Sequence, residues 1–240
     1  MELKHYLSEI KTFLESNADP KVVEKNSRYF KEGYDAYGIP QEKWDNQKTA
    51  WIKEWKDVLG FDGFLKLGDI LMENGKYEEC SCAIVFMKPF SVQFTEDTYN
   101  HFGYWLEKGI QNWAHTDILC GELLSPMLKN KKVRLTSMIT WRESPSKWKR
   151  RAVPVSMLGL LKGTEDYSQI FEFISPMMMD KERVVHQGLG WFLREAWKIK
   201  PEQVEPYLMK WKDTAPRLIF QYATEKMTAE NKLRFRKEKK

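Results

Sequence analysis

A single carboxylate with an aromatic neighbour is the clearest candidate for chemistry in this chain. Trp113 and Asp117 are four positions apart, so on a helix they lie one turn apart on the same face. A carboxylate stabilises a nearby positive charge and can orient or deprotonate water, and the face of a tryptophan ring attracts cations. The pair therefore suits a reaction that passes through a cation. A helix cap or an ion-pair partner is the alternative role for Asp117.

Two further fragments place basic residues beside tryptophans. They are Lys147-Trp148-Lys149-Arg150-Arg151-Ala152 and Gly188-Leu189-Gly190-Trp191-Phe192-Leu193-Arg194-Glu195. The chain holds ten tryptophans, and each one taken alone is better explained by a position in the core. The periodicity of the sequence does not distinguish a core position from a role in a functional site for these tryptophans.

The common catalytic and metal-binding signatures are missing. The sequence has no G-x-x-x-x-G-K-[ST] loop, no G-x-S-x-G elbow and no H-E-x-x-H motif. Gly188-Leu189-Gly190 lacks both a preceding strand and the third glycine of a dinucleotide site. The four histidines and the three cysteines, Cys80, Cys82 and Cys120, do not have metal-ligand spacing. We therefore expect no metal, no cofactor and no disulfide.

The positive charge is concentrated in two segments. The chain carries 39 Lys and Arg against 34 Asp and Glu, a net charge of +5. Residues 129–151 carry +8 and residues 231–240 carry +5, so the remaining residues carry −8. This division predicts a positive face for a polyanion. A solvated helix face with an adjoining loop is the alternative.

Composition excludes two broad classes of protein. With 42% hydrophobic residues over 240 positions, the chain can build a sizeable core, unlike an intrinsically disordered protein. No apolar run approaches the ~20 residues that cross a bilayer, and the start at Met1–His5 leads into a charged segment without a signal-peptide core. We expect a cytoplasmic protein that does not associate with membranes.

The apolar pattern predicts helices throughout. Apolar residues recur at three- and four-residue spacing, as in Tyr6, Ile10, Phe13 and Leu14. The best strand candidate, 82–87, fits a buried helix better because Pro89 stops it. Prolines punctuate the chain, and Asp19-Pro20 and Ser144-Pro145-Ser146 have the composition of helix starts. Because no Gly/Ser linker divides the sequence, we expect one domain over 1–230 and a basic tail over 231–240.

A weak repeat indicates how the helices are arranged. Segments with a polar opening and a long apolar continuation begin near Lys76, Gln111, Lys147 and Lys181, at offsets of 35, 36 and 34 residues. Helix pairs at a period of about 35–45 residues are typical of HEAT-type solenoids. The predicted fold is an all-α, HEAT-like helical-repeat solenoid with a concave surface. A non-repetitive helical bundle is the alternative.

Four motifs follow one another between Ser27 and Glu195. They are Arg28-Tyr29 with Tyr37-Gly38-Ile39-Pro40, then Trp113-x-x-x-Asp117, Trp148-x-x-Arg151-Ala152 and Gly190-Trp191-x-Leu193-Arg194-Glu195. In these motifs and their order the chain resembles the AlkD-type DNA alkylation repair glycosylases, a HEAT-like family that removes N3- and N7-alkylated purines. The resemblance implies that the concave face of the solenoid is a DNA-binding face. The sequence departs from the family pattern at Ala114, His115, Thr116, Pro154 and Gly188.

The resemblance implies a role for each matching residue. Asp117 would be the catalytic carboxylate, Trp113 and Trp191 the aromatic walls of the site, and Arg151 a cation that holds a phosphate. The expected DNA contacts are Arg28, Tyr29, Lys147, Trp148, Lys149, Arg150 and Arg194.

The resemblance also implies a reaction. The alkylated purine is already a cationic leaving group, and Asp117 would stabilise the oxocarbenium-like sugar that forms and position the attacking water. The expected protein is a monofunctional DNA glycosylase that acts on double-stranded DNA as a monomer, with no metal or cofactor. A non-catalytic HEAT-like module that binds DNA or a protein is the alternative.

Overall fold

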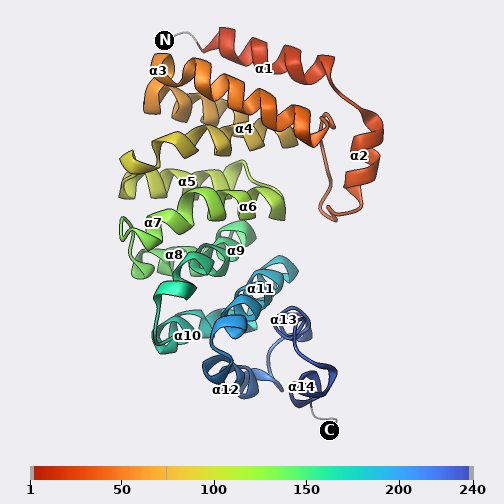
Figure 1. Ribbon diagram of the computed structural model, residues 1–240, viewed down its shortest axis with the longest axis vertical. Coiled ribbons are helices and arrows are strands. Elements are labelled where there is room, and N and C mark those ends of the chain that lie inside the picture. The colour runs from red at the N-terminus through yellow and green to blue at the C-terminus, as the bar shows by residue number, and fades with distance from the viewer. Residues whose placement is uncertain (1–2, 74, 238–240) are drawn as a thin grey trace. The chain divides into compact units, whose positions relative to one another are not determined.

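The computed structural model describes residues 3–73 and 75–237, and all of their regular secondary structure is helical (Figure 1). The predicted all-α class and helical-repeat fold are confirmed. The chain, expected to form one domain over 1–230, divides into two compact units, Met1–Leu123 and Leu124–Lys240. The boundary between them falls within the π-helical turn η2, Cys120–Leu124.

The first unit is a layered set of helices (Figure 1). Its elements are α1 (Lys4–Ser16), α2 (Pro20–Ser27), α3 (Gln41–Glu73), α4 (Tyr77–Met87), the 3-10 helix η1 (Lys88–Gln93), α5 (Glu96–Lys108) and α6 (Trp113–Leu119). Residues 82–87 form part of α4, which confirms the helix predicted there. Within α3 the chain bends at Gly60, where φ is 60°.

Aromatic packing forms the core of the first unit. Trp51 and Trp55 are fully buried and stack with ring centroids 5.3 Å apart. Phe86 of α4 packs edge-on against both rings. Aromatic pairs of this kind contribute about 0.5–1.5 kcal/mol each beyond the area that they bury. The expectation that most tryptophans are core residues holds for these two.

The second unit contains the rest of the helices. They are α7 (Ser125–Lys129), η3 (Leu135–Met138), α8 (Ile139–Arg142), α9 (Lys147–Ser156), η4 (Met157–Gly163), α10 (Ser168–Ile174), η5 (Ser175–Met179), α11 (Arg183–Ile199), α12 (Pro201–Trp211), α13 (Arg217–Ala223) and α14 (Ala229–Arg234). The central helix is α11, which packs against both α9 and α13. Leu189, Phe192 and Leu193 of α11 are completely buried.

Helices begin where the repeat predicted them. The four repeat starts near 76, 111, 147 and 181 fall within two residues of the first residues of α4, α6, α9 and α11. Side-chain caps fix several of these starts. The Oδ1 atom of Asp19 accepts from the N–H of Lys21, with Pro20 at the first helical position. At the predicted start Ser144-Pro145-Ser146 the proline precedes α9 and does not lie in its first turn, because the N-cap is Ser146, which accepts from the N–H of Lys149.

The basic C-terminal segment is packed as far as it is described. Residues 231–234 lie in α14, and the side chain of Phe235 is completely buried. The carboxylate of Glu205 on α12 accepts from Asn231 at 3.0 Å and from Arg234 at 2.7 Å. The tail predicted from residue 231 therefore begins inside a helix, and its last three residues lie outside the described part of the chain.

None of the helices described over residues 3–73 and 75–237 combines the length and the apolarity that a membrane span needs.

Two glycines let α11 approach its neighbours. A Cβ atom at Gly190 would lie 2.5 Å from the Cβ of Tyr222 and 2.7 Å from the carbonyl oxygen of Ile219, both on α13. A Cβ at Gly188 would lie 3.3 Å from the Cγ of Arg151 and 3.4 Å from the Cγ2 of Val155, so two side chains need to shift by only a few tenths of an ångström. The two positions therefore form a matched pair.

We predict that Gly190→Ala lowers the free energy of unfolding by about 1–3 kcal/mol, because α13 must shift to avoid overpacking. Gly188→Ala should change it by less than about 1 kcal/mol, since the helix propensity of alanine offsets a mild contact. Urea denaturation of the two variants measures the difference. Equal effects at both positions would contradict the packing described here.

Candidate functional site

The first turn of α6 carries the pair that the sequence singled out. Trp113 is the first residue of this helix and Asp117 lies one turn further on, so the predicted spacing on one helical face is confirmed. The N-cap is Asn112, whose Oδ1 atom accepts from the N–H of His115 at 2.9 Å. The side chains of Trp113 and Asp117 are both half-buried.

The loop after α2 fixes the orientation of Trp113. The indole Nε1–H donates to the carbonyl oxygen of Tyr29 at 3.1 Å. The indole also stacks on Phe30, with centroids 5.5 Å apart and planes 16° apart. Phe30 in turn stacks on Tyr34, at 4.5 Å and 13°. The structure thus brings Tyr29 and Trp113 together through the Tyr29 backbone, 84 residues earlier in the chain.

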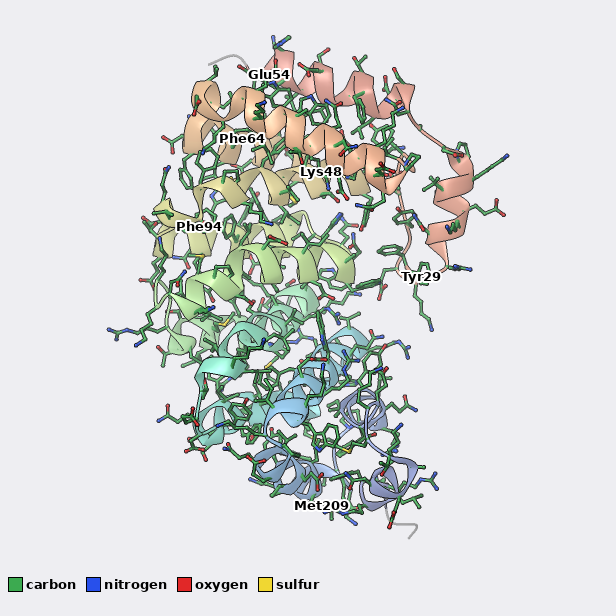
Figure 2. All side chains as sticks on the ribbon, viewed as in Figure 1. Tyr29, Lys48, Glu54, Phe64, Phe94 and Met209 are labelled. Atoms are coloured by element: carbon green, nitrogen blue, oxygen red, sulfur yellow. The ribbon has the colours of Figure 1, made fainter. Side chains whose placement is uncertain are left out.

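The side chains of Arg28 and Tyr29 lie on the surface. Tyr29 is 55% exposed and is labelled on the loop that follows α2 in Figure 2. The Nη2 atom of Arg28 donates to the Tyr29 hydroxyl at 2.8 Å, and the guanidinium lies 4.8 Å from the centre of the ring. Both side chains are accessible to an external ligand.

A buried histidine supports the start of α6. The Nε2 atom of His115 lies 2.9 Å from the carbonyl oxygen of Tyr77 and 3.1 Å from the Ser81 hydroxyl. Because a carbonyl only accepts, Nε2 carries the proton, and Nδ1 accepts from the Asn112 amide at 2.8 Å. The imidazole also stacks on the Tyr77 ring at 4.4 Å. Burial lowers the pKa of His115 to about 4, although its hydrogen bond to the Tyr77 carbonyl acts in the opposite direction.

A buried carboxylate anchors the other end of the same loop. Glu78 is 3% exposed, and it accepts the backbone N–H groups of Tyr37, Gly38 and Ile39 at 2.9–3.3 Å. Gly38 has φ 81°, and a Cβ atom there would lie 2.4 Å from the carbonyl oxygen of Asp19. Only glycine fits this turn. Sequence reasoning missed Glu78, although a glutamate within the apolar helix α4 was a usable signal.

In the second unit, Arg151 joins α9 to the start of α11. It is 5% exposed, and its Nη1 atom donates to the carbonyl oxygen of Val184 at 2.6 Å. Trp148 is 7% exposed, and the ammonium of Lys147 lies 4.9 Å from the centre of its ring. The half-buried Lys149 lies 5.6 Å above the ring of Trp141.

Two of the expected DNA-contacting arginines are held in ion pairs. The Nε atom of Arg150 donates to Asp180 at 2.6 Å, and its Nη1 atom donates to the carbonyl oxygens of Ser144 and Pro145. Arg194 contacts Glu195 and Glu225 at 3.0 and 2.5 Å.

The remaining expected aromatic wall, Trp191, lies on α11 at the edge of a cleft of about 660 Å³. Glu195, one turn further along the helix, lines the same cleft. The candidate residues thus form two groups, one in each unit. Arg28, Tyr29, Trp113 and Asp117 belong to the first unit, and Lys147, Trp148, Lys149, Arg150, Arg151, Trp191 and Arg194 belong to the second.

Comparison with known proteins identifies the family. The family model described as "DNA alkylation repair enzyme" matches residues 10–227, which is most of the chain. The chain belongs to the DNA alkylation repair enzyme family. Among solved structures, a predicted DNA alkylation repair enzyme from Enterococcus faecalis superposes with a TM-score of 0.76, over 89% of this chain and 98% of that one. At 16% identity this neighbour supports the fold. No curated protein matches the chain.

Within 3–73 and 75–237, no group of three or more His, Cys, Asp or Glu side chains is arranged to hold a metal ion. The three cysteines, Cys80, Cys82 and Cys120, are buried thiols.

Because His115 is buried in its neutral form, the free energy of unfolding of this family member should depend on pH. Histidine in the unfolded chain binds its proton near pH 6.5, but the folded protein takes it up only near pH 4. The unfolded state therefore binds more protons between these values, and the stabilising contribution present above pH 6.5 is lost as the pH falls towards 4. We expect this loss to reach roughly 3 kcal/mol.

Chemical denaturation of wild type and His115→Gln across pH 4–7 isolates this contribution. The difference in free energy of unfolding between the two proteins should shrink as the pH falls, since only the wild type carries the imidazole. A difference that stays constant over this range would contradict a buried neutral His115.

Proposed function

We propose that this family member is a cytoplasmic, monofunctional DNA glycosylase that hydrolyses the N-glycosidic bond of N3- and N7-alkylated purines in duplex DNA. The observation that carries the proposal is the Trp113 and Asp117 pair on the first turn of α6, in a chain that belongs to a DNA alkylation repair family. The proposed enzyme works as a monomer.

The chemistry of the substrate matches these two side chains. Alkylation at N3 or N7 gives the purine a positive charge, so the base leaves without being protonated. As the bond between C1′ and the base breaks, the electron pair goes to the base and positive charge develops on the sugar. The Asp117 carboxylate stabilises that charge and accepts a proton from the attacking water. The face of Trp113 contributes about 0.5–2 kcal/mol of cation–π attraction.

The surroundings of Trp113 support catalysis because they fix its ring in place. The indole N–H bond to the Tyr29 carbonyl and the stack on Phe30 hold the Trp113 ring in one orientation. Fixed groups need little reorganisation when charge develops in the transition state. The exposed Arg28 and Tyr29 side chains on the same loop are proposed contacts to the DNA backbone.

The second unit carries the other proposed residues, which match the family pattern. Trp191 is a proposed aromatic contact to the lesion nucleotide, and Arg151, which donates to the Val184 carbonyl, is a proposed phosphate contact. Lys147 and Lys149 are proposed phosphate contacts. Arg150 bonds Asp180 and the Ser144 carbonyl, which fixes the loop before α9. The ring of Trp148 packs beneath the ammonium of Lys147. We infer that Arg150 and Trp148 act on DNA binding by positioning these lysines.

The Asp117→Asn variant tests the carboxylate directly. We expect single-turnover release of 3-methyladenine or 7-methylguanine from methylated duplex DNA to fall at least about a hundredfold, because the charge that stabilises the transition state is lost. Affinity for DNA should be retained. Asp62→Asn removes one exposed carboxylate from the same unit and is the matched control, with release at the wild-type rate.

Two results would overturn this assignment. If Asp117→Asn releases bases at the wild-type rate, the catalytic role of this carboxylate is wrong. If the wild type releases no base but binds DNA with the salt dependence of phosphate contacts, the chain is a non-catalytic binding module.

A further inference from the structure

Three helices of the second unit begin with a basic residue. Lys147 is the first residue of α9, Arg183 of α11 and Arg217 of α13. They are 36 and 34 residues apart, so they occupy equivalent positions in the helical repeat. At the equivalent positions earlier in the chain, the helices α4 and α6 begin with Tyr77 and Trp113. This position of the repeat therefore changes from aromatic to basic in the second unit.

A basic residue at the start of a helix runs against a local preference. The helix dipole makes the N-terminal end positive, so acidic side chains are favoured there and basic ones are unfavourable. The helices α3, α4, α5, α12 and α14 follow the preference, because each has a glutamate in its first turn. The first turns of α9, α11 and α13 contain no acidic residue. Departures of this kind are expected at functional sites.

Helices α9 and α11 run in the same direction. Arg151 of α9 donates to the carbonyl oxygen of Val184 in the first turn of α11. Four residues further along both helices, Val155 lies where a Cβ atom at Gly188 would touch it, at 3.4 Å. Because the contacts advance together along the two helices, their first residues lie at the same end of the pair.

Helix α13 also runs in this direction, on the opposite face of α11 (Figure 1). The Gln187 amide donates to the Tyr222 hydroxyl, and further along both helices Arg194 pairs with Glu225. The face of α11 that approaches α13 is marked by Gly190. It lies two residues after the glycine that faces α9, a rotation of roughly 200° about the helix axis. Since packed helices have axes about 8–10 Å apart, the three basic starts form a row with steps of this size.

A fourth cation joins the row beside Arg217. The Nη1 atom of Arg217 donates at 2.8 Å to the carbonyl oxygen of Phe235, which belongs to the peptide bond that leads into Arg236. The Phe235 side chain is completely buried, so this part of the segment is anchored. Both arginines are exposed, and partial burial together with the positive charge of Arg236 lowers the pKa of Arg217. Two like charges held close together cost free energy that a bound anion recovers.

The arginines of this row are not neutralised by the protein. Among residues 3–73 and 75–237, no acidic side chain forms an ion pair with Arg183, Arg217 or Arg236. Lys226, in the turn between α13 and α14, differs from them because it pairs with Glu225 at 3.1 Å. The field along the row is therefore positive.

We propose that Arg183, Arg217 and Arg236 continue the phosphate contacts of Lys147 along the backbone of a DNA duplex. A row of cations matches a polyanion whose phosphates recur at a regular interval, about every 3.4 Å along each strand. From α9 to α13 the row covers about 16–20 Å, or about 5–6 base pairs. The three arginines lie outside the motifs that resemble the repair family. The proposal rests on DNA as the partner in the proposed function and adds a backbone track to it.

Replacing each arginine by glutamine, singly and together, tests the track. Affinity for an undamaged duplex of about 20 base pairs, longer than the row, is measured by fluorescence anisotropy at several salt concentrations. Each single variant should lower the slope of log affinity against log salt by about 0.9, and the triple variant by about 2.7, because each phosphate contact releases counterions. Single-turnover release of an alkylated base at saturating protein should stay at the wild-type rate.

Three variants separate charge from structure. Arg217→Lys keeps the charge and should keep the wild-type slope. Lys226→Gln removes a lysine that Glu225 already neutralises, and it should leave the slope unchanged. Arg183→Gln tests the track without disturbing the packing of α14, since Arg183 is exposed and its side chain forms no hydrogen bond within the described part of the chain.

The outcomes separate the track from the proposed function. A triple variant with the wild-type slope overturns the track and leaves DNA as the partner. A slope that falls equally in Lys226→Gln and in Arg183→Gln also overturns it, because the effect would then follow net charge alone. A wild type that does not bind the duplex removes DNA as the partner, and the track with it. If the slopes change as expected but the wild type releases no base, the track stands and the glycosylase assignment is wrong.

Discussion

Three backbone N–H groups converge on the buried carboxylate of Glu78, and the geometry of the first unit's site depends on this contact. It fixes the turn at residues 37–39, which Gly38 alone can form because any side chain there would collide with the Asp19 carbonyl. The turn ends a loop whose beginning reaches Trp113 through the carbonyl oxygen of Tyr29. The buried carboxyl group of Glu78 is thus hydrogen-bonded by the same backbone segment that it holds in place, as buried polar groups require.

A neutral histidine stabilises the interior beneath α6, so no charge is buried there. His115 stays neutral because it is buried, and its two ring nitrogens connect Tyr77 and the N-cap Asn112. A protonated imidazole in the first turn of α6 would oppose the binding of a cationic base and the growth of positive charge on the sugar. The departure from the family pattern at His115 therefore serves structure and is compatible with the proposed chemistry.

Local signals in the sequence predicted the local features well. The apolar period gave the helical class, the repeat located the starts of four helices, and the four-residue spacing placed Trp113 and Asp117 on one face of α6. The sequence singled out Gly38 only as part of the motif Tyr37-Gly38-Ile39-Pro40 and did not indicate why this turn needs glycine. Its physical reason, the approach of the Asp19 carbonyl, needed the folded chain.

Contacts between distant residues were out of reach of the sequence. Glu78 lies about 40 residues from the turn that it binds, and Asp180 lies 30 residues from Arg150. A run of basic residues does not indicate which of its side chains form ion pairs in the folded protein. The sequence therefore predicted the same DNA-binding role for Arg150 and Lys147. In the structure Arg150 pairs with Asp180, whereas Lys147 lies over the ring of Trp148. The burial of Trp148 is likewise a property of packing.

The proposed site acts on a base that is already cationic, and discrimination between leaving groups tests this property most directly. Duplexes that carry a single 7-methylguanine or a single hypoxanthine, a neutral purine, are incubated with the wild-type protein, and the free base is identified by mass. The account predicts release of 7-methylguanine and no detectable release of hypoxanthine. Release of both at comparable rates would contradict it, because the site would then have to activate a neutral leaving group.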